Sequence, residues 1–189
     1  MAKLVLVKHA PPQIVDDVAS HRWVLSEAGR GRCDWLALQL ADQGVTQIYA
    51  SLEPKALETA ALTAVRLGLE MRPRRGLHEN DRTGLGFLPM EELRARIERF
   101  FAEPSMLVIG TETAEAAGRR FEAAVRALQA DAGDADVAVI THGTVLTTLV
   151  ARYNDVAPFA FWDSLTVPSV VVLDGATFGL DGPPRTFTA

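Results

Sequence analysis

Residues 3–9 read KLVLVKH, and residues 136–144 read DVAVITHGT. In each stretch a short apolar run ends at a histidine, His9 in the first and His142 in the second. Such runs, rich in Val, Leu and Ile and lacking polar alternation, are typical of strands buried on both faces of a parallel sheet. Ligands of these sheets bind beyond the carboxyl ends of the strands. The two histidines are therefore predicted to share a site if their strands are neighbours.

Hydrophobic periodicity in the rest of the chain alternates between short buried strands and amphipathic helices. The expected strands cover residues 3–8, 46–51, 70–73, 136–141 and 169–174, and the expected helices cover residues 26–44, 54–68, 90–101, 113–130 and 143–153. This alternation predicts an α/β fold, a three-layer α/β/α sandwich with a mainly parallel central sheet. We expect residues 1–189 to form a single domain, in which residues 80–112 partly cover the site.

The composition is that of an ordinary soluble protein, with 48% hydrophobic and 23% charged residues among 189. The apolar runs are too short to span a bilayer and no signal-peptide core is visible, so the cytoplasm is the expected location. The net charge of −5 argues against nucleic-acid and membrane binding, although it leaves room for a small positive pocket. The single cysteine, Cys33, excludes an internal disulfide and a cysteine-based zinc cluster.

The residues near the two histidines suit the transfer of a phosphoryl group. An imidazole at a strand end can attack phosphorus if one ring nitrogen is unprotonated and the other is held by a hydrogen bond. The phosphoryl oxygens then need cations, and Lys8 and Lys55 are the candidates. The leaving oxygen needs a proton donor, for which Glu79 is the first candidate and Asp81 the second.

Seven segments, in order, carry a family resemblance: LVLVKHA (4–10), LSEAGR (25–30), SLEPKALETA (51–60), LHE (77–79), GTETAEAAGRRF (110–121), VITHGT (139–144) and FWDSLTVPSVVVL (161–173). Together they resemble the histidine phosphatase superfamily, also called the phosphoglycerate-mutase-like family, and the resemblance is to a short member. The family's Arg-His-Gly step is matched by Lys8, His9 and Ala10. Its second His-Gly step is matched by His142 and Gly143.

The resemblance implies a metal-independent phosphomonoester hydrolase that works through a phosphohistidine intermediate and needs no cofactor. His9 is the residue that becomes phosphorylated, and His142 helps to bind and stabilise the transferring group. Lys8 and Lys55 take the phosphate-binding positions, together with Gly143. The implied role of Glu79 is that of a general acid that later helps to activate water.

The two lysines depart from the family pattern, which has arginine at both positions. The chain has 19 basic residues, of which only Lys3, Lys8 and Lys55 are lysines, so a general drift toward lysine does not explain the change. Lysine keeps the charge but lacks the planar fork that binds phosphate through two bonds. The sequence predicts a working but slow or differently tuned site. Repulsion between the ammonium groups, together with burial, is expected to lower the pKa of at least one lysine.

Other interpretations remain open at the level of the sequence. One is a catalytically silent member that binds a phosphorylated ligand or protein partner. Another is a mutase, although the short chain favours hydrolysis, and a third is metal chemistry using His78 and Glu79. The substrate is either a small phosphorylated metabolite or a phosphoprotein. Arg82, Arg94, Arg96 and Arg99 are candidates for contacting a second anionic group, and the oligomeric state is not indicated.

Overall fold

A six-stranded sheet forms the centre of the computed structural model, which describes residues 2–188. The strands are β1 (Lys3–Lys8), β2 (Gln47–Ala50), β3 (Met71–Pro73), β4 (Val137–Thr141), β5 (Ser169–Asp174) and β6 (Arg185–Thr186). They lie in the order β3-β2-β4-β1-β5-β6. The first four run parallel to one another, whereas β5 pairs antiparallel with β1, and β6 antiparallel with β5. The prediction of a mainly parallel sheet is confirmed.

The pairing that matters most for the site is the one between β1 and β4. These strands are direct parallel neighbours, and Lys8 lies opposite Thr141 in their register. Both strands therefore end at the same edge of the sheet, and His9 and His142 follow them there. The adjacency on which the sequence argument depended is confirmed.

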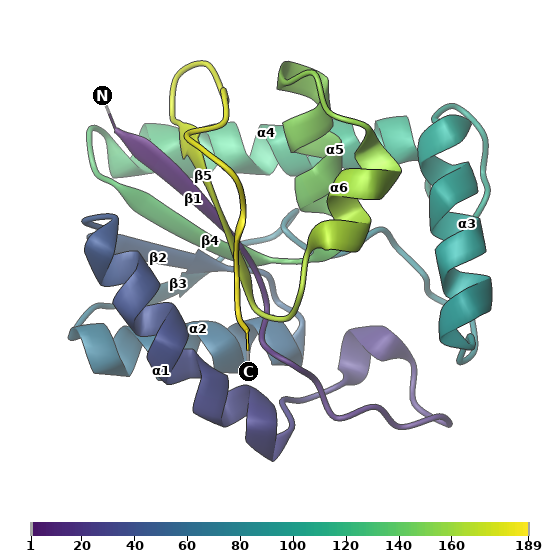
Figure 1. Cartoon of the computed structure of the whole chain (residues 1–189), viewed down its shortest axis with the longest axis horizontal. Helices are drawn as coiled ribbons and strands as arrows, with labels where there is room; N and C mark the ends of the chain where they lie inside the picture. The colour runs from purple at the N-terminus through teal and green to yellow at the C-terminus, as the bar shows by residue number, and fades with distance from the viewer. Residues whose placement is uncertain (1, 189) are drawn as a thin grey trace.

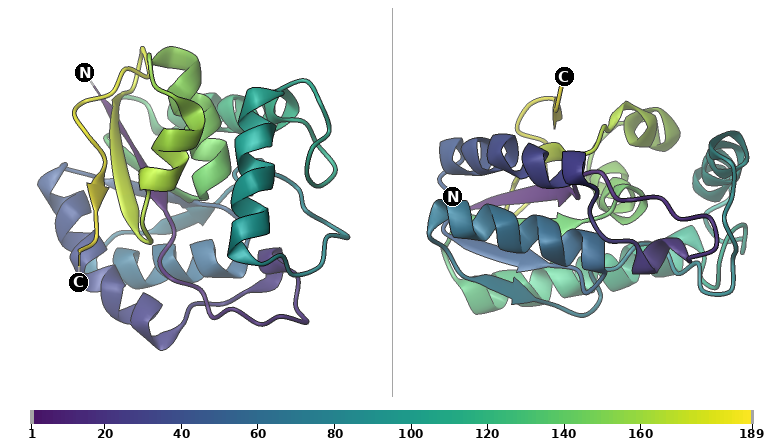
Figure 2. Two further views of the ribbon diagram at one scale, coloured as in Figure 1. Left: turned by 45° about the vertical axis from the view of Figure 1, so that its right-hand side comes forward. Right: turned by 90° about the horizontal axis from the view of Figure 1, so that it is seen from below.

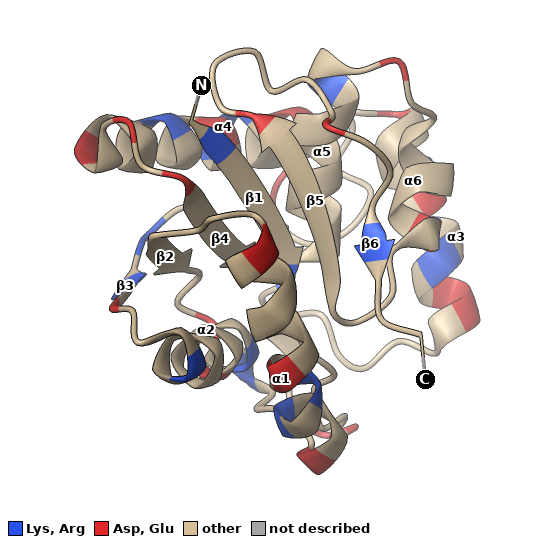
Figure 3. Cartoon of the chain, turned by 60° about the vertical axis from the view of Figure 1, so that its left-hand side comes forward, with Lys and Arg blue, Asp and Glu red and all other residues tan. Residues whose placement is uncertain are grey.

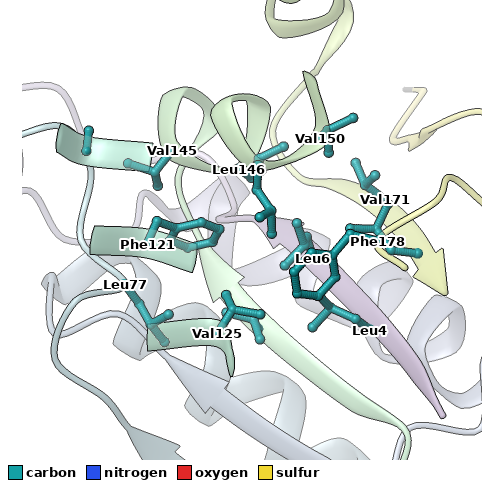
Figure 4. Close-up of a cluster of buried hydrophobic side chains, with 14 of the residues drawn as sticks. Leu4, Leu6, Leu77, Phe121, Val125, Val145, Leu146, Val150, Val171 and Phe178 are labelled. Atoms are coloured by element: carbon teal, nitrogen blue, oxygen red, sulfur yellow. The ribbon is translucent and has the colours of Figure 1, made fainter. Parts of the chain in front are cut away.

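Helices cover both faces of the sheet (Figures 1 and 2). The helices are α1 (Glu27–Asp42), α2 (Pro54–Leu67), α3 (Met90–Ala102), α4 (Ala114–Ala132), α5 (Gly143–Tyr153) and α6 (Pro158–Ser164). Alternate side chains of β1 pack on opposite faces: Val5 and Val7 belong to the core under α1 and α2, whereas Leu4 and Leu6 belong to the core under α4 and α5. The second of these cores includes Phe121 of α4 and is drawn in Figure 4. This arrangement is the predicted three-layer sandwich.

Three short elements are not predicted by the hydrophobic pattern: the 3-10 helix η1 (Ser20–Arg22), α6 and β6. They span three, seven and two residues, too few for helical or strand periodicity to emerge from the sequence. The longer elements follow the predicted positions. Ser26, for example, is the N-cap of α1, and Gly68 ends α2 in a left-handed conformation with φ of 65°.

The surface carries charges of both signs. Acidic and basic positions are interspersed over the helices visible in Figure 3. Within residues 2–188, no helix is both long enough and apolar enough to cross a membrane.

The start of α1 is tied to the loop that follows His9. The Ser26 hydroxyl accepts a hydrogen bond from the N–H of Gly29 and donates one to the carbonyl of Pro11, both at 3.0 Å. A Cβ atom on Gly29 would collide with that same carbonyl, whereas a Cβ atom on Gly31 would meet nothing within 4 Å. The helix therefore approaches the His9 loop as closely as it does only because residue 29 has no side chain.

The two glycines of α1 are expected to respond in opposite ways to alanine. Gly31→Ala should raise the free energy of unfolding by about 0.5–1 kcal/mol, because alanine is the better helix former. Gly29→Ala should lower it by about 1–3 kcal/mol, because backbone must move to admit the methyl group. Urea denaturation of both variants measures the difference. Equal stabilisation by both changes would show that the contact with Pro11 does not constrain the fold.

Candidate active site

One cavity of about 390 Å³ opens at the carboxyl ends of β1 and β4. The residues to which the resemblance assigns catalysis or phosphate binding all line it: Lys8, His9, Lys55, Glu79, His142 and Gly143. The backbone N–H of His9 donates to the carbonyl of Thr141 at 3.0 Å, which continues the pairing of β1 with β4 by one residue. Segments far apart in the sequence thus meet at this edge of the sheet. The chemical roles of these residues remain predictions.

His9 is held in one orientation by its own neighbour in the chain. Its Nδ1 lies 2.8 Å from the carbonyl oxygen of Ala10. A carbonyl can only accept, so Nδ1 carries the proton of the neutral ring and Nε2 keeps a free electron pair. Burial, the nearby His142 and the charge of Lys55 hold the pKa of His9 well below its usual range. The ring is therefore neutral near pH 7, as a nucleophilic imidazole must be.

His142 packs edge-on against His9, with ring centroids 5.3 Å apart. Its Nε2 lies 2.8 Å from the hydroxyl oxygen of Ser51 and 3.4 Å from a carboxylate oxygen of Glu53. Burial and the charge of Lys55 lower its pKa well below the usual range. Its Nδ1 is buried and has no hydrogen-bond partner among the described residues. A buried ring nitrogen without a partner is costly, so this atom is suited to meet a ligand.

Because Gly143 has no side chain, the side chains of Lys8 and Trp162 can lie close to its backbone. A Cβ atom at this position would lie 3.2 Å from both Cε of Lys8 and Nε1 of Trp162. The ammonium group of Lys8 donates to the carbonyl of Leu165 at 2.8 Å and lies 5.8 Å from the centroid of the Trp162 ring. Burial lowers the pKa of Lys8 to about 8, and the charge of Glu79 only partly opposes this shift. One lysine pKa falls as expected, but burial rather than repulsion by Lys55 causes the shift.

Lys55 is almost completely buried in the first turn of α2. Its ammonium group donates to the carbonyl of Ser20 at 2.7 Å and to the carboxylate of Glu53 at 2.5 Å. Glu53 also accepts a hydrogen bond from the N–H of Glu79, at 2.9 Å. Two of the three ammonium protons thus have protein partners, which leaves one for a ligand.

The side chain of Glu79, which belongs to the loop after β3, reaches the N-terminus of α5. Its carboxylate accepts hydrogen bonds from the N–H groups of Thr144 and Val145, both at 3.2 Å, and from its neighbour Asn80 at 2.9 Å. Burial alone would raise the pKa of Glu79, but the charge of Arg82 and the N–H of Asn80 contribute to a net decrease. The carboxylate is therefore ionised near pH 7 in the unliganded site, where the helix N-terminus also favours a negative charge.

Arg82 brings a third cation into the cavity. Its guanidinium group donates to the hydroxyl of Thr144 at 3.1 Å and to the side-chain oxygen of Asn80 at 2.8 Å, and lies 3.9 Å from Glu79. From the sequence, Arg82 was predicted only as a residue that could contact a second anionic group of the substrate. Glu53 was not predicted to belong to the site. The available signal for Glu53 was its spacing, since a carboxylate two residues before Lys55 at a helix start can fold back onto it.

The other residues named from the sequence lie outside this arrangement or at its margin. Asp81, the second candidate acid, lines a neighbouring cavity of about 340 Å³ with His78. Arg96 and Arg99 pair with glutamates one turn away along α3. Residues of the segment 80–112 do line the His9 cavity, including Arg94. Among residues 2–188 no three His, Cys, Asp or Glu side chains are grouped so that they could hold a metal ion.

Comparison with known proteins identifies the family of the chain. The model of the histidine phosphatase superfamily (branch 1) matches residues 6–178. The chain belongs to the histidine phosphatase superfamily. A search among curated protein sequences gives no significant match.

Several solved structures share this fold over nearly the whole chain. A mycobacterial glucosyl-3-phosphoglycerate phosphatase is 20% identical, with a TM-score of 0.77 over 99% of this chain and 100% of that one. The Entamoeba histolytica phosphoserine phosphatase is 18% identical, with a TM-score of 0.77 over 98% of each chain. Bacillus stearothermophilus YhfR is 22% identical, with a TM-score of 0.73 over 96% of each chain. At these identities the likeness establishes the fold alone.

This superfamily member is expected to lose affinity for inorganic phosphate as the pH rises through about 8, where Lys8 loses its charge. Phosphate itself stays dianionic above that pH, so the loss reports on the protein. Losing one charge-assisted bond should weaken binding about ten- to a hundredfold. Lys8→Arg retains its charge and should bind phosphate with little change up to pH 10. Calorimetric titration measures both, and a parallel loss in wild type and Lys8→Arg would show that another group titrates.

Proposed function

We propose that this protein hydrolyses phosphomonoesters through a phosphohistidine formed on His9. The observation that carries the proposal is the state of His9, which is neutral, has Nδ1 bound to the Ala10 carbonyl and keeps Nε2 free beside a buried group of cations. The superfamily membership and the phosphatase structures that share the fold support the same chemistry.

In the first step, Nε2 of His9 forms a bond to phosphorus and the bond from phosphorus to the ester oxygen breaks. The departing oxygen takes a proton and leaves as an alcohol. In the second step, a water molecule attacks the phosphohistidine, which releases inorganic phosphate and restores the neutral ring. The Nδ1 proton stays on the ring throughout, and its hydrogen bond to the Ala10 carbonyl stabilises the positive charge that the ring gains on phosphorylation.

The phosphoryl oxygens are bound by groups from four parts of the chain. Lys8 and Lys55 each have an ammonium proton available, and Arg82 supplies a guanidinium group that compensates in part for the missing arginines. His142 donates from Nδ1, the buried nitrogen without a protein partner. The Ser51 hydroxyl can donate to its Nε2, since that oxygen already accepts from the N–H of Glu53. This leaves the neutral ring with its proton on Nδ1.

Glu79 gives a proton to the leaving oxygen and takes one from water in the second step. Its carboxylate is ionised near pH 7, because Arg82 and backbone N–H groups stabilise the charge. A bound phosphate dianion places a like charge beside it and partly neutralises Arg82. Both effects raise the pKa of Glu79 and favour the protonated form when substrate is present.

Hydrolysis fits the site better than mutase chemistry or silent binding. The cavity is open enough for water to reach His9, and a mutase must shield its phosphohistidine from water. A protein that only bound a phosphorylated ligand, without catalysis, would not need His9, Glu79 and His142 to line one cavity. The inferred substrate is a small phosphorylated molecule that reacts without metal or cofactor in the cytoplasm.

His9 should carry phosphate during turnover. A reaction with a substrate that carries radiolabelled phosphate should be quenched rapidly without acid, and the peptides should be mapped at alkaline pH, where phosphohistidine is stable. The label should be found on His9. His9→Ala should abolish both the label and turnover. His21→Ala, which changes a histidine outside the cavity, serves as the matched control and should keep both. Undiminished turnover by His9→Ala would contradict the mechanism.

Glu79→Gln should slow substrates with poor leaving groups far more than activated aryl phosphates. Only poor leaving groups need a proton as the ester bond breaks, so kcat should fall about 10²–10⁴-fold for alkyl esters and about tenfold or less for nitrophenyl phosphate. Glutamine keeps an oxygen for the N–H groups of α5, which limits the structural effect of the change. Equal slowing of both substrate types would assign proton transfer to another group.

A further inference from the structure

We propose that the cavity beside His9 includes an apolar subsite for the leaving group, and that the substrate is a small phosphomonoester of an aryl or alkyl alcohol. This inference rests on the proposed function and adds the class of substrate. It differs from what the names of the similar structures suggest, since glucosyl-3-phosphoglycerate and phosphoserine carry polar groups next to the phosphate.

Apolar side chains line the same cavity as the phosphate-binding residues. They include Ile14, Trp23, Met90, Leu93 and Trp162. Two of them are unusually exposed for their size, with Ile14 at 55% and Met90 at 61%. Single exposed apolar residues are common, but here they gather at the mouth of one cavity with partly buried Trp and Leu side chains. Such a surface is suited to cover an apolar ligand group.

The charged groups near these apolar residues already have partners. Arg94 forms an ion pair with Asp163 and lies over the ring of Phe159, with its guanidinium carbon 5.4 Å from the ring centroid. Both charged residues line the cavity, so the pair sits at its rim as a neutral unit. Lys8 and Arg82 serve the phosphoryl oxygens in the proposed mechanism. A carboxylate on the leaving group would therefore enter an apolar region without a cation of its own, which is unfavourable.

The loop that presents Ile14 is anchored to the rest of the protein. Gln13 donates its N–H to the carbonyl of Val24 at 2.8 Å, and the indole of Trp23 donates to the carbonyls of Val15 and Val18. A second wall of the subsite is formed by Met90 and Leu93 from the first turn of α3, which stands at the side of the sandwich in Figure 1. The two walls come from separate, hydrogen-bonded segments, so the subsite exists before a ligand arrives.

Calorimetry with a series of alkylphosphonates tests the subsite without requiring turnover. Methyl-, propyl- and hexylphosphonate share a head group that mimics phosphate and cannot be hydrolysed. Each methylene that becomes buried should tighten binding about three- to fourfold, so hexylphosphonate should bind at least tenfold more tightly than methylphosphonate. Carboxyethylphosphonate, similar in length to propylphosphonate, should bind more weakly than it. Equal affinities across the series, or tighter binding of the carboxylate, would overturn the inference.

Variants assign the effect to the proposed walls. Met90→Gln keeps the shape of the side chain and makes it polar, so the ratio of hexyl- to methylphosphonate affinity should fall severalfold. Met106→Gln is the matched control, because Met106 is similarly exposed, at 50%, but does not line the cavity. It should leave the ratio unchanged. Ile14→Asn changes the other wall in the same way. If both single variants keep the wild-type ratio of hexyl- to methylphosphonate affinity, the alkyl chains bind elsewhere.

Two further results separate this inference from its alternatives. If a substrate phosphorylates His9 but all the phosphonates bind with equal affinity, the proposed hydrolase activity is supported and the apolar subsite is not. If the affinity increases with alkyl length but no phosphohistidine forms, the apolar subsite is supported and the proposed function is wrong. A peptide that carries phosphonomethylphenylalanine, a mimic of phosphotyrosine that cannot be hydrolysed, should bind no more tightly than benzylphosphonate. Much tighter binding of the peptide would contradict a small-molecule substrate in favour of a phosphoprotein.

Discussion

The parallel pairing of β1 with β4 is the constraint on which the site depends. It aligns Lys8 with Thr141, and the hydrogen bond from His9 to Thr141 extends the alignment to the first residue beyond the strand. The two histidine rings must then emerge side by side at the edge of the sheet, 5.3 Å apart. Side chains on both faces of the buried sheet fix the pairing of its strands. The packed core therefore holds the two histidines in fixed positions.

The charges of the site follow from its burial. Lys8, Lys55 and Arg82 line the cavity with Glu79, and the buried carboxylate of Glu53 adjoins them. Buried charges need partners, which explains why Glu53 holds Lys55 and why Arg82 lies close to Glu79. Three cations against two carboxylates leave a small positive excess in a chain whose net charge is −5. A dianionic ligand can enter such a pocket although the protein as a whole is acidic.

The sequence could predict the fold because its signals were local and repeated. The run LVLV before Lys8 indicated a doubly buried strand, and Ser26 and Gly68 indicated the ends of helices. The positions of His9, Glu79 and His142 followed from strand ends and from motifs in a fixed order. Arg82 and Glu53 could not be assigned in the same way, because their roles depend on contacts with Thr144 and Lys55 that only the tertiary structure creates. The ionised state of Glu79 also depends on the N-terminus of α5, which is remote in sequence.

In the proposed mechanism, Nε2 of His9 attacks phosphorus while Nδ1 of His142 holds a phosphoryl oxygen. A crystal structure with vanadate, which adopts the geometry of a phosphoryl group in transfer, tests both parts at once. We expect vanadium bonded to Nε2 of His9, with its oxygens in contact with Nδ1 of His142 and with the ammonium group of Lys8. Vanadate bound elsewhere in the protein, or bonded through Nδ1 of His9 after loss of the contact to Ala10, would rule out this mechanism.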